Sequence, residues 1–330
     1  MSRISVYYKN KGVIVAGGAG FVGSAIARLL LRRGAEVTVI DSLSKDCGGN
    51  ILNLNDIKNE IRFIRADINS SKKALAAIKR CDVLFNCIGM TNHLKSNAEP
   101  MKDLEFNAVN HLRLLTLCAR HNPAVRIVYL GSRSQYGPAA GKTPVKENKA
   151  MNPIDFHSAH KTLGEFYHNL FRHISGLNTV SLRIANVYGP GQDMRGHNPG
   201  ILNYFVKEAL CAGKIVIYGG RDRAKEFVYV DDAAEAAILA GAATRVQGSF
   251  NIGGNKILLA QAAETAIKAA GKGSLGLKPF PEKLKKIDTG EILIDSSAAN
   301  NAFGWKPTTK LSDGLKTTVA YYLKYEKQYF

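Results

Sequence analysis

The chain has 330 residues, of which 45% are hydrophobic, and this suits one large α/β domain with a smaller one attached. Its longest apolar stretch without charge, Gly12–Ala27, is interrupted by glycines and is too short to cross a membrane. The first residues lack the apolar core of a signal peptide. Five cysteines occur without a Cys-x-x-Cys pair, so we expect reduced thiols in the cytoplasm and no metal site.

The formal net charge of +18 indicates an anionic partner or a generally basic host proteome. Nucleic acid is one such partner, but the basic residues are spread along the chain. The tightest group, Lys283, Lys285 and Lys286, has no aromatic residues interleaved with it. A field that attracts anionic substrates explains the charge equally well, and a basic host proteome explains it without any function, so we expect neither nucleic acid nor a membrane as partner.

The most informative segment begins with a predicted strand, Val13–Ala16, which runs into a cluster of glycines. A helix predicted over Phe21–Arg33 and a second strand, Glu36–Ile40, follow. Such a unit builds a dinucleotide site, because glycines let the backbone turn sharply and let a pyrophosphate approach the free N–H groups at the helix start. The expected cofactor ligands in this segment are Gly17, Gly20, Phe21, Val22 and Gly23.

Asp41 follows the second predicted strand, where its carboxylate can accept hydrogen bonds from both ribose hydroxyls of an adenosine. The same charge would repel the 2′-phosphate of NADP, so the sequence favours NAD as cofactor. A tight strand-to-helix turn that binds nothing is the alternative interpretation of this segment.

Strand-like runs and amphipathic helical stretches alternate along the chain. We predict further strands over Arg62–Arg65, Val83–Cys87, Arg126–Leu130, Thr179–Ile184, Lys214–Tyr218 and Ser249–Ile252. We predict further helices over Ser70–Lys79, Pro100–His121, Phe156–His173, Ile201–Ala212 and Asp232–Ala242, and little besides helix beyond Leu258.

This alternation predicts an α/β fold: a Rossmann-type doubly wound parallel sheet with a smaller C-terminal α/β substrate-binding domain. Residues 1–184, with 227–255 returning to them, are expected to form the NAD-binding domain. Residues 185–226 and 256–330 are expected to form the substrate-binding domain.

Ligands of such folds bind outside the carboxyl ends of the strands. The residues that follow the predicted strands are mostly small, polar or acidic: Gly17–Gly23, Asp41, Asp67–Ile68, Cys87–Thr91, Gly131–Ser134 and Asn186. From this set we assign Cys87 to the cofactor, and Thr91 and Ser134 to the substrate.

These segments together resemble the extended short-chain dehydrogenase/reductases, and within them the nucleotide-sugar epimerase/dehydratase group that includes UDP-glucose 4-epimerase. The matching segments follow the family's order over nearly the whole chain: Gly17–Gly23, Asp67–Ile68, Asn107, Ser132 to Gly137, Lys161 to Glu165, Leu182–Gly191 and Phe227–Asp232. The resemblance implies a tightly held NAD, a nucleotide-diphosphate sugar as substrate, and a homodimer that pairs through the helices predicted at Pro100–His121 and Phe156–His173.

The resemblance also implies roles for single residues. It places beside the cofactor Asp67, Ile68, Asn107 and Lys161. It implies that Ser132 hydrogen-bonds the reacting sugar hydroxyl and that Asn186 meets the substrate diphosphate.

One departure from the family lies in its Tyr-x-x-x-Lys signature, because the residue one helical turn before Lys161 is His157. A neutral imidazole, with an ordinary pKa of about 6.5, can accept the sugar proton without the large shift that a phenol of pKa about 10 needs. Imidazole is roughly two ångströms shorter than phenol, so a bridging water or a shifted substrate can be required. A protein that binds without reacting is the alternative. His160 is expected at the surface or in an interface.

A second departure precedes Phe227, where the family usually has Arg-Asp and this chain has Lys225-Glu226. Lysine keeps the charge but loses the bidentate fork, so the diphosphate is expected to meet Lys225 or Arg223, with Arg221 as an alternative.

The dehydratases of the family carry carboxylates directly after the serine, whereas Arg133, Ser134 and Gln135 follow Ser132 here. The resemblance therefore implies 4-epimerisation through a 4-keto intermediate. A dehydratase or reductase of the same family is the alternative.

Overall fold

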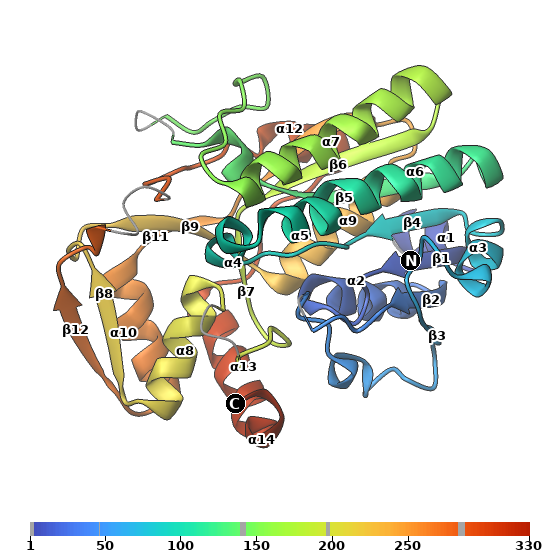
Figure 1. Ribbon diagram of the computed structural model, residues 1–330. Helices are drawn as coiled ribbons and strands as arrows, with labels where there is room; N and C mark the ends of the chain where they lie inside the picture. The colour runs from blue at the N-terminus through green and yellow to red at the C-terminus, as the bar shows by residue number, and fades with distance from the viewer. Residues whose placement is uncertain (1–2, 46, 139–142, 196–198, 283–287) are drawn as a thin grey trace.

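The computed structural model describes residues 3–45, 47–138, 143–195, 199–282 and 288–330 (Figure 1). These residues form a seven-stranded sheet in the order β10-β6-β5-β4-β1-β2-β3, with all neighbouring strands parallel. Its strands are β1 (Gly12–Ala16), β2 (Glu36–Asp41), β3 (Arg62–Arg65), β4 (Val83–Asn86), β5 (Arg126–Ser132), β6 (Asn178–Ile184) and β10 (Gly248–Ile252). The strand order reverses between β1 and β4, so the predicted doubly wound parallel sheet is confirmed.

Helices cover both faces of this sheet. In β1, Val13 and Val15 belong to one buried cluster, and Ile14 and Ala16 belong to the other, as the alternation of side chains along a strand requires. The first cluster includes residues of α2 (Phe21–Arg32) and α9 (Val230–Ala242), and the second includes residues of α3 (Lys72–Ile78), α6 (Asn110–His121) and α7 (Phe156–Ser175).

The prediction of a single helix over Pro100–His121 is wrong in detail. The segment forms α5 (Pro100–Leu104), a π-helical turn η2 (Glu105–Val109) and then α6. The wide turn holds Asn107, whose side-chain amide is fully buried and donates to the carbonyl oxygen of Met90 at 3.0 Å. Such turns often mark functional sites, and periodicity alone does not reveal them.

A smaller unit lies to the lower left of the main sheet in Figure 1. Its sheets are three-stranded, β11-β9-β7, and two-stranded, β12-β8, within the described residues. Its elements are β7 (Asn186–Tyr188), α8 (Ile201–Cys211), β8 (Lys214–Tyr218), β9 (Ala224–Tyr229), β11 (Asn255–Leu258), α10 (Leu259–Ala270), β12 (Ser274–Lys278) and α13 (Leu311–Lys324).

The expectation of little besides helix beyond Leu258 is wrong, because β12 pairs in parallel with β8 there. β12 reads Ser-Leu-Gly-Leu-Lys and contains no β-branched residue, so it lacks the usual composition of a strand. β10 joins the main sheet and β9 the smaller one, while the domain boundaries themselves stay a prediction.

The remaining elements are short. They are α1 (Arg3–Tyr8), η1 (Ile51–Leu54), α4 (His93–Ala98), η3 (Arg133–Tyr136), α12 (Ser297–Phe303) and α14 (Glu326–Tyr329). None of the helices in the described part of the chain has the length and apolar character that crossing a membrane requires.

Candidate active site

The glycine loop between β1 and α2 forms a tight backbone cradle. Gly17 has φ +75°, and a Cβ atom there would lie 2.9 Å from the carbonyl oxygen of Cys87. A Cβ atom at Gly23 would lie 2.4 Å from the carbonyl oxygen of Gly17. Gly20 caps α2 without a side-chain hydrogen bond, so the first N–H groups of the helix, from Phe21 and Val22 onward, are open to an anion.

Asp41 lies at the end of β2 against this loop. Its Oδ2 accepts a hydrogen bond from the Ala19 N–H at 3.0 Å, and its Oδ1 accepts one from the Leu43 N–H at 2.8 Å. Burial raises the pKa of this carboxyl, and the two backbone donors partly offset that effect. A carboxylate has about four acceptor positions, so two remain for the ribose hydroxyls that the sequence analysis assigns to Asp41.

Three further predicted cofactor residues follow β3 and β4. Asp67 is exposed and accepts a hydrogen bond from the Asn69 N–H at 2.8 Å, while Ile68 is buried. Burial raises the pKa of the Cys87 thiol to about 12, so this thiol is neutral and serves as an apolar wall.

Gly89, Asn107 and Lys161 meet directly beyond β4. A Cβ atom at Gly89 would lie 2.4 Å from Asn107 Oδ1 and 3.0 Å from Lys161 Nζ. Asn107 Oδ1 is buried and accepts no hydrogen bond among the described residues. An unpartnered buried acceptor is costly in a native protein, so this oxygen marks a place where a ligand donor fits.

Lys161 is buried on α7 and reaches toward the sheet. Its Nζ donates to the carbonyl oxygen of Leu130 at 3.1 Å and lies 5.3 Å from the centre of the Tyr129 ring. Burial lowers the pKa of Lys161 to about 8, although the charge of Asp103 opposes the shift. The ammonium group is therefore held beside the carboxyl end of β5.

Ser132 ends β5 and begins the short helix η3. Its Oγ accepts a hydrogen bond from the Ser134 N–H at 3.2 Å, and the two hydroxyl oxygens lie 2.9 Å apart. Its own N–H donates to Gln135 Oε1 at 2.8 Å. This reciprocal capping fixes both predicted serines, so they lie side by side after β5.

His157 occupies the start of α7, one turn before Lys161, and is 3% exposed. Its Nδ1 lies 3.8 Å from Asp103 Oδ2, and its ring meets the His93 ring edge-on at 4.5 Å between centres. Burial lowers the pKa of His157 to about 4; Asp103 opposes the shift, while His93 and Lys161 add to it. The imidazole is thus neutral at physiological pH, the state that a base requires.

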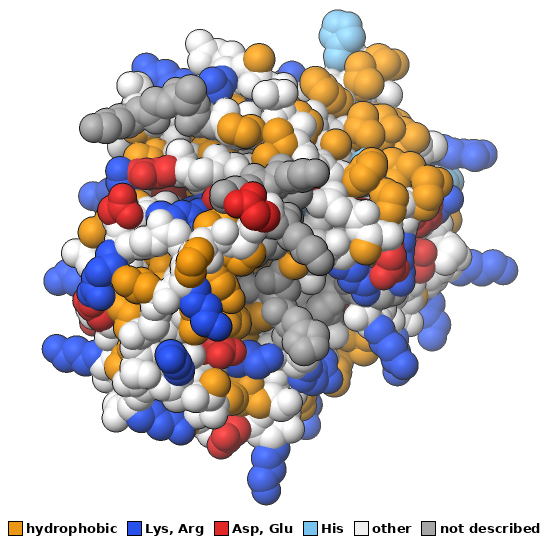
Figure 2. All heavy atoms as spheres, turned by 60° about the vertical axis from the view of Figure 1, so that its left-hand side comes forward, with side chains coloured by type: hydrophobic (Ala, Val, Ile, Leu, Met, Phe, Trp, Pro, Cys, Tyr) orange, Lys and Arg blue, Asp and Glu red, His pale blue; other side chains and the backbone are white. Residues whose placement is uncertain are grey.

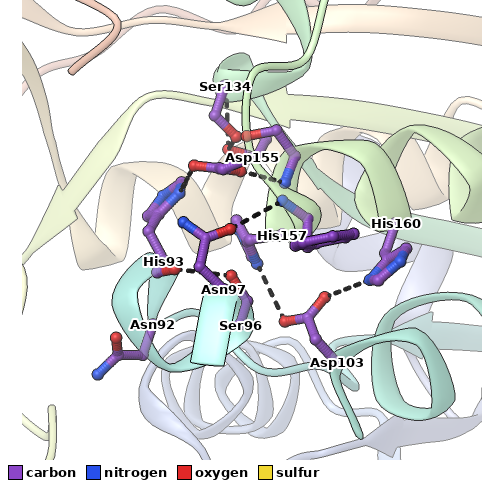
Figure 3. A network of polar contacts seen from close by, with 12 residues as sticks. Asn92, His93, Ser96, Asn97, Asp103, Ser134, Asp155, His157 and His160 are labelled. Carbon is purple, nitrogen blue, oxygen red and sulfur yellow. Dashed lines mark hydrogen bonds and ion pairs between the residues drawn. The ribbon is translucent and has the colours of Figure 1, made fainter. Parts of the chain in front are cut away.

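Sequence reasoning missed the residues that surround His157. Figure 3 shows Asp103 between His157 and His160, facing both rings. His160 is 8% exposed and its Nδ1 lies 2.8 Å from Asp103 Oδ1, so the expectation of a surface position is wrong. Because Asp103 sits inside a helix far away in the sequence, no local pattern separates it from a solvated carboxylate.

Asp155 and His93 form a second pair beside the first. Asp155 caps α7 by accepting a hydrogen bond from the Ser158 N–H at 2.7 Å, and its Oδ2 lies 2.6 Å from His93 Nδ1. Although its burial acts in the opposite direction, the contacts with His93 and Ser158 hold the pKa of Asp155 well below its usual range. Asp155 directly precedes α7, and aspartate is a preferred residue at this N-cap position, which is the sequence signal for it.

The predicted substrate residues Arg223 and Lys225 share one carboxylate. Both donate to Asp288, with Lys225 Nζ 3.0 Å from Asp288 Oδ1. Arg133 lies close enough to lower the pKa of Lys225, which burial lowers first. The structure therefore forms a cationic cluster of Arg133, Arg223 and Lys225, with Asp288 and Glu226 as the acids beside it.

The other predicted substrate residues are less constrained. Asn186 begins β7 and its Nδ2 donates to the carbonyl oxygen of Glu226 at 2.8 Å. Thr91 is exposed in the loop before α4. In the described part of the chain, no three His, Cys, Asp or Glu side chains form a group that could hold a metal ion.

Comparisons with known proteins agree with this geometry. The family model described as "NAD dependent epimerase/dehydratase family" matches residues 13–253. The chain is similar to the UDP-glucose 4-epimerase of Mycolicibacterium smegmatis, with 30% identity over 315 residues that cover 94% of this chain and 97% of the relative.

Solved structures show the same similarity. One is the UDP-N-acetylglucosamine 4-epimerase of Methanobrevibacter ruminantium in complex with UDP-N-acetylmuramic acid, with TM-score 0.87, 27% identity, and coverage of 96% of this chain and 99% of that one. Another is the Thermus thermophilus UDP-glucose 4-epimerase in complex with NAD, with TM-score 0.81, 27% identity, and coverage of 94% and 98%.

Proposed function

Because the chain belongs to the NAD-dependent epimerase/dehydratase family, we propose that it inverts the C4 hydroxyl of a UDP-hexose. One observation carries the proposal: His157 and Lys161 lie buried one turn apart on α7, and Lys161 Nζ donates to a carbonyl of β5, the strand that ends at Ser132. A neutral base and a cation held at this edge of the sheet match a reaction that removes a proton from a sugar hydroxyl.

The residues that follow β1, β2 and β4 fit NAD, the cofactor of the family. The cradle of Gly17 and Gly23 leaves room only for backbone, and Asn107 Oδ1 is a buried acceptor without a donor. Asp41 would hold the adenosine ribose, Lys161 the nicotinamide ribose, and the start of α2 the pyrophosphate. When bound, the nicotinamide supplies the redox chemistry, since it takes up and returns the hydrogen of the sugar carbon.

The residues of the chain supply the proton chemistry. His157 takes the proton of the C4 hydroxyl, and it returns this proton after the sugar has turned its other face toward the nicotinamide. Ser132 hydrogen-bonds the same hydroxyl and orients it. The ammonium of Lys161 stays positive below its pKa of about 8, which keeps His157 neutral and favours the developing negative charge on the sugar oxygen.

The cationic cluster is the proposed binding site of the substrate diphosphate. Asp288 and Glu226 together offset only part of the charge of Arg133, Arg223 and Lys225. Lys225 and Arg223 would rearrange from Asp288 toward the diphosphate, and Asn186 would meet it from β7. A net positive pocket of this kind attracts an anionic nucleotide over a neutral sugar.

Elimination of water is not favoured by this site. Ser134 and Gln135 are held in the capping contacts with Ser132, and Arg133 carries positive charge. A dehydratase needs an acid beside the sugar, and η3 offers none. Epimerisation needs no such acid, because its proton chemistry is supplied by the base, His157.

We also propose that two copies pair through α7. Its outward face carries large hydrophobic side chains at helical spacing, Phe156, Leu163, Phe166, Leu170 and Ile174, which are 37% to 75% exposed. Figure 2 shows hydrophobic side chains gathered at its upper right, on the side where the helices α5 to α7 come into view. An apolar face of this kind on a folded chain is typical of an interface. The five cysteines form no disulfide with one another, which supports a reducing compartment such as the cytoplasm.

The test is product analysis. The protein with NAD is incubated separately with UDP-glucose, UDP-N-acetylglucosamine and UDP-glucuronate, and the products are resolved by proton NMR of the sugar signals. The proposal predicts the C4 epimer of at least one of the three, without loss of water. Formation of a 4-keto-6-deoxy sugar, or no conversion of any of the three by protein that binds NAD, would contradict it.

A further inference from the structure

The environment of His157 contains a buried nitrogen that faces a carboxylate. His157 Nδ1 is buried and has no hydrogen-bond partner among the described residues, yet Asp103 Oδ2 lies 3.8 Å away. Catalytic hydrogen bonds are often this long before substrate binds and shorten in the complex. No hydrogen bond from a described residue occupies the other ring nitrogen, Nε2, and we place the substrate hydroxyl there.

Asp103 is itself fixed from two sides. Its side chain is fully buried, His160 Nδ1 lies 2.8 Å from Oδ1, and Asn107 Nδ2 donates to Oδ2 at 2.9 Å. Its own burial would raise the pKa of Asp103, but the contacts with His157, Asn107 and His160 lower it overall. The carboxylate therefore stays ionised, and an ionised carboxylate can only accept hydrogen bonds.

Among the described residues, the titratable groups that act on His157 are Asp103, His93 and Lys161. His93 from α4 meets the ring edge-on and is paired with Asp155 at the start of α7. Asp103 from α5 faces Nδ1, and Lys161 lies one turn further along α7. Among these groups, Asp103 is the one acceptor that faces His157 Nδ1 (Figure 3).

From this geometry, we propose that Asp103 is the positioning residue for His157. Its carboxylate accepts the Nδ1–H of the imidazole, so the proton of the neutral ring stays on Nδ1 and Nε2 keeps its lone pair. In the reaction the sugar O–H bond breaks, its proton forms Nε2–H, and its electron pair stays on the sugar oxygen. The imidazolium that results is stabilised by Asp103, and the proton later returns to the sugar oxygen by the reverse route.

The proposal explains how histidine can stand at this position of α7. An imidazole without a fixed tautomer would carry its proton on Nε2 for part of the time and could not then act as a base. The contacts of His160 and Asn107 with Asp103 hold the carboxylate where it keeps the imidazole proton on Nδ1. This inference rests on the proposed epimerase function, so its test includes a measurement that needs no turnover.

The first measurement is made on the wild-type protein with isotope-labelled histidine nitrogens. A two-bond proton–nitrogen NMR spectrum reports which ring nitrogen carries the proton, and the loss of signals in His157→Gln identifies His157. We expect His157 to carry its proton on Nδ1, and in Asp103→Asn we expect a shift of that proton toward Nε2. A wild-type His157 protonated on Nε2 would overturn the proposal, whether or not any sugar is turned over.

The second measurement is kinetic. Asp103→Asn should lower kcat on the order of a hundredfold or more, the range of acid–base catalysis, with KM changed by less than about threefold. Glu105→Gln, at an exposed carboxylate two residues further along the chain that pairs with Arg113, is the matched control and should keep wild-type kcat. In the His157→Gln background, Asp103→Asn should cause no further loss, because it acts through the imidazole.

An unchanged kcat in folded Asp103→Asn would overturn the positioning role and leave the epimerase function standing. Folding of each variant is checked by thermal unfolding and by NAD binding. A wild-type protein that converts no UDP-sugar would contradict the function, while the NMR result would still decide the role of Asp103.

Discussion

Gly89 and Asn107 approach so closely that no side chain fits between them. A Cβ atom at Gly89 would lie 2.4 Å from Asn107 Oδ1, and the backbone of Gly89 has φ +152°, a conformation that other residues rarely adopt. Gly89 is therefore needed for Asn107 and Lys161 to face the same point beyond β4.

Gly89→Ala should weaken NAD binding and lower kcat, because the added methyl group would displace the Asn107 amide and the Lys161 ammonium. We expect a loss of affinity for NAD of about tenfold or more, equivalent to roughly 1.4 kcal/mol. Isothermal titration calorimetry with NAD measures it. Gly12→Ala in β1, where a Cβ atom would lie 3.4 Å from its nearest neighbour, is the control and should bind NAD normally.

A buried ion pair holds α7 to the sheet. Arg183 Nη2 lies 2.6 Å from Glu165 Oε1, and both side chains are almost fully buried. Ser249 and Gln135 also donate to Glu165, at 2.7 and 2.9 Å. Removal of the carboxylate would leave Arg183 as a buried charge without its partner.

Glu165→Ala should lower the free energy of unfolding by about 3–5 kcal/mol, the cost of breaking a buried pair from one side. Urea denaturation followed by circular dichroism measures this change. Glu264→Ala breaks the exposed ion pair with Arg221 and should cost less than about 1 kcal/mol. Equal losses of unfolding free energy in the two variants would show that the buried pair of Glu165 stabilises the fold no more than the exposed pair does.

The rate of reaction should depend on pH in a bell shape. The pKa of His157 is lowered to about 4 chiefly by burial, and the base is neutral only above this value. The pKa of Lys161 is lowered to about 8, also by burial, so its positive charge is lost above that pH. We expect kcat/KM to rise near pH 4, stay level, and fall near pH 8. An acid limb near 6.5, the ordinary value for histidine, would contradict the assignment of the buried imidazole.

The proposed dimer can be tested by the mass of the protein in solution, without a measurement of activity. Phe166 and Leu170 are each 49% exposed on α7. Changing both to glutamate should prevent pairing, because burial of two carboxylates in the interface is costly. Multi-angle light scattering should show the mass of two chains for the wild type and of one chain for Phe166→Glu/Leu170→Glu. Leu323→Glu, at a residue 53% exposed on α13, is the control and should leave the mass unchanged. A wild-type protein with the mass of one chain would contradict the dimer.

The sequence predicted the elements whose cause is local. The glycines after Val13–Ala16 and the Asp41 at the end of β2 follow from turn geometry and strand periodicity, and both lie where expected. His157 and Lys161 share a helix, so their common direction was also predictable.

The sequence did not predict contacts between distant segments. Asp103 faces His157 because α5 packs beside α7, and Asp288 joins Arg223 and Lys225 from a loop far along the chain. A carboxylate in such a segment has the same appearance in the sequence whether it is buried or solvated. The π-helical turn at Asn107 is hidden for the same reason, since the helical periodicity continues through it.

The most direct test of the account is the rate at which His157→Gln epimerises the UDP-sugar that the wild type converts, with NAD at saturation. Glutamine keeps much of the size of the side chain but offers no basic nitrogen. The account predicts that kcat falls by a factor on the order of 10² to 10⁴ while NAD still binds, and that His173→Gln at the exposed end of α7 keeps its activity. A His157→Gln protein that epimerises at the wild-type rate would contradict it.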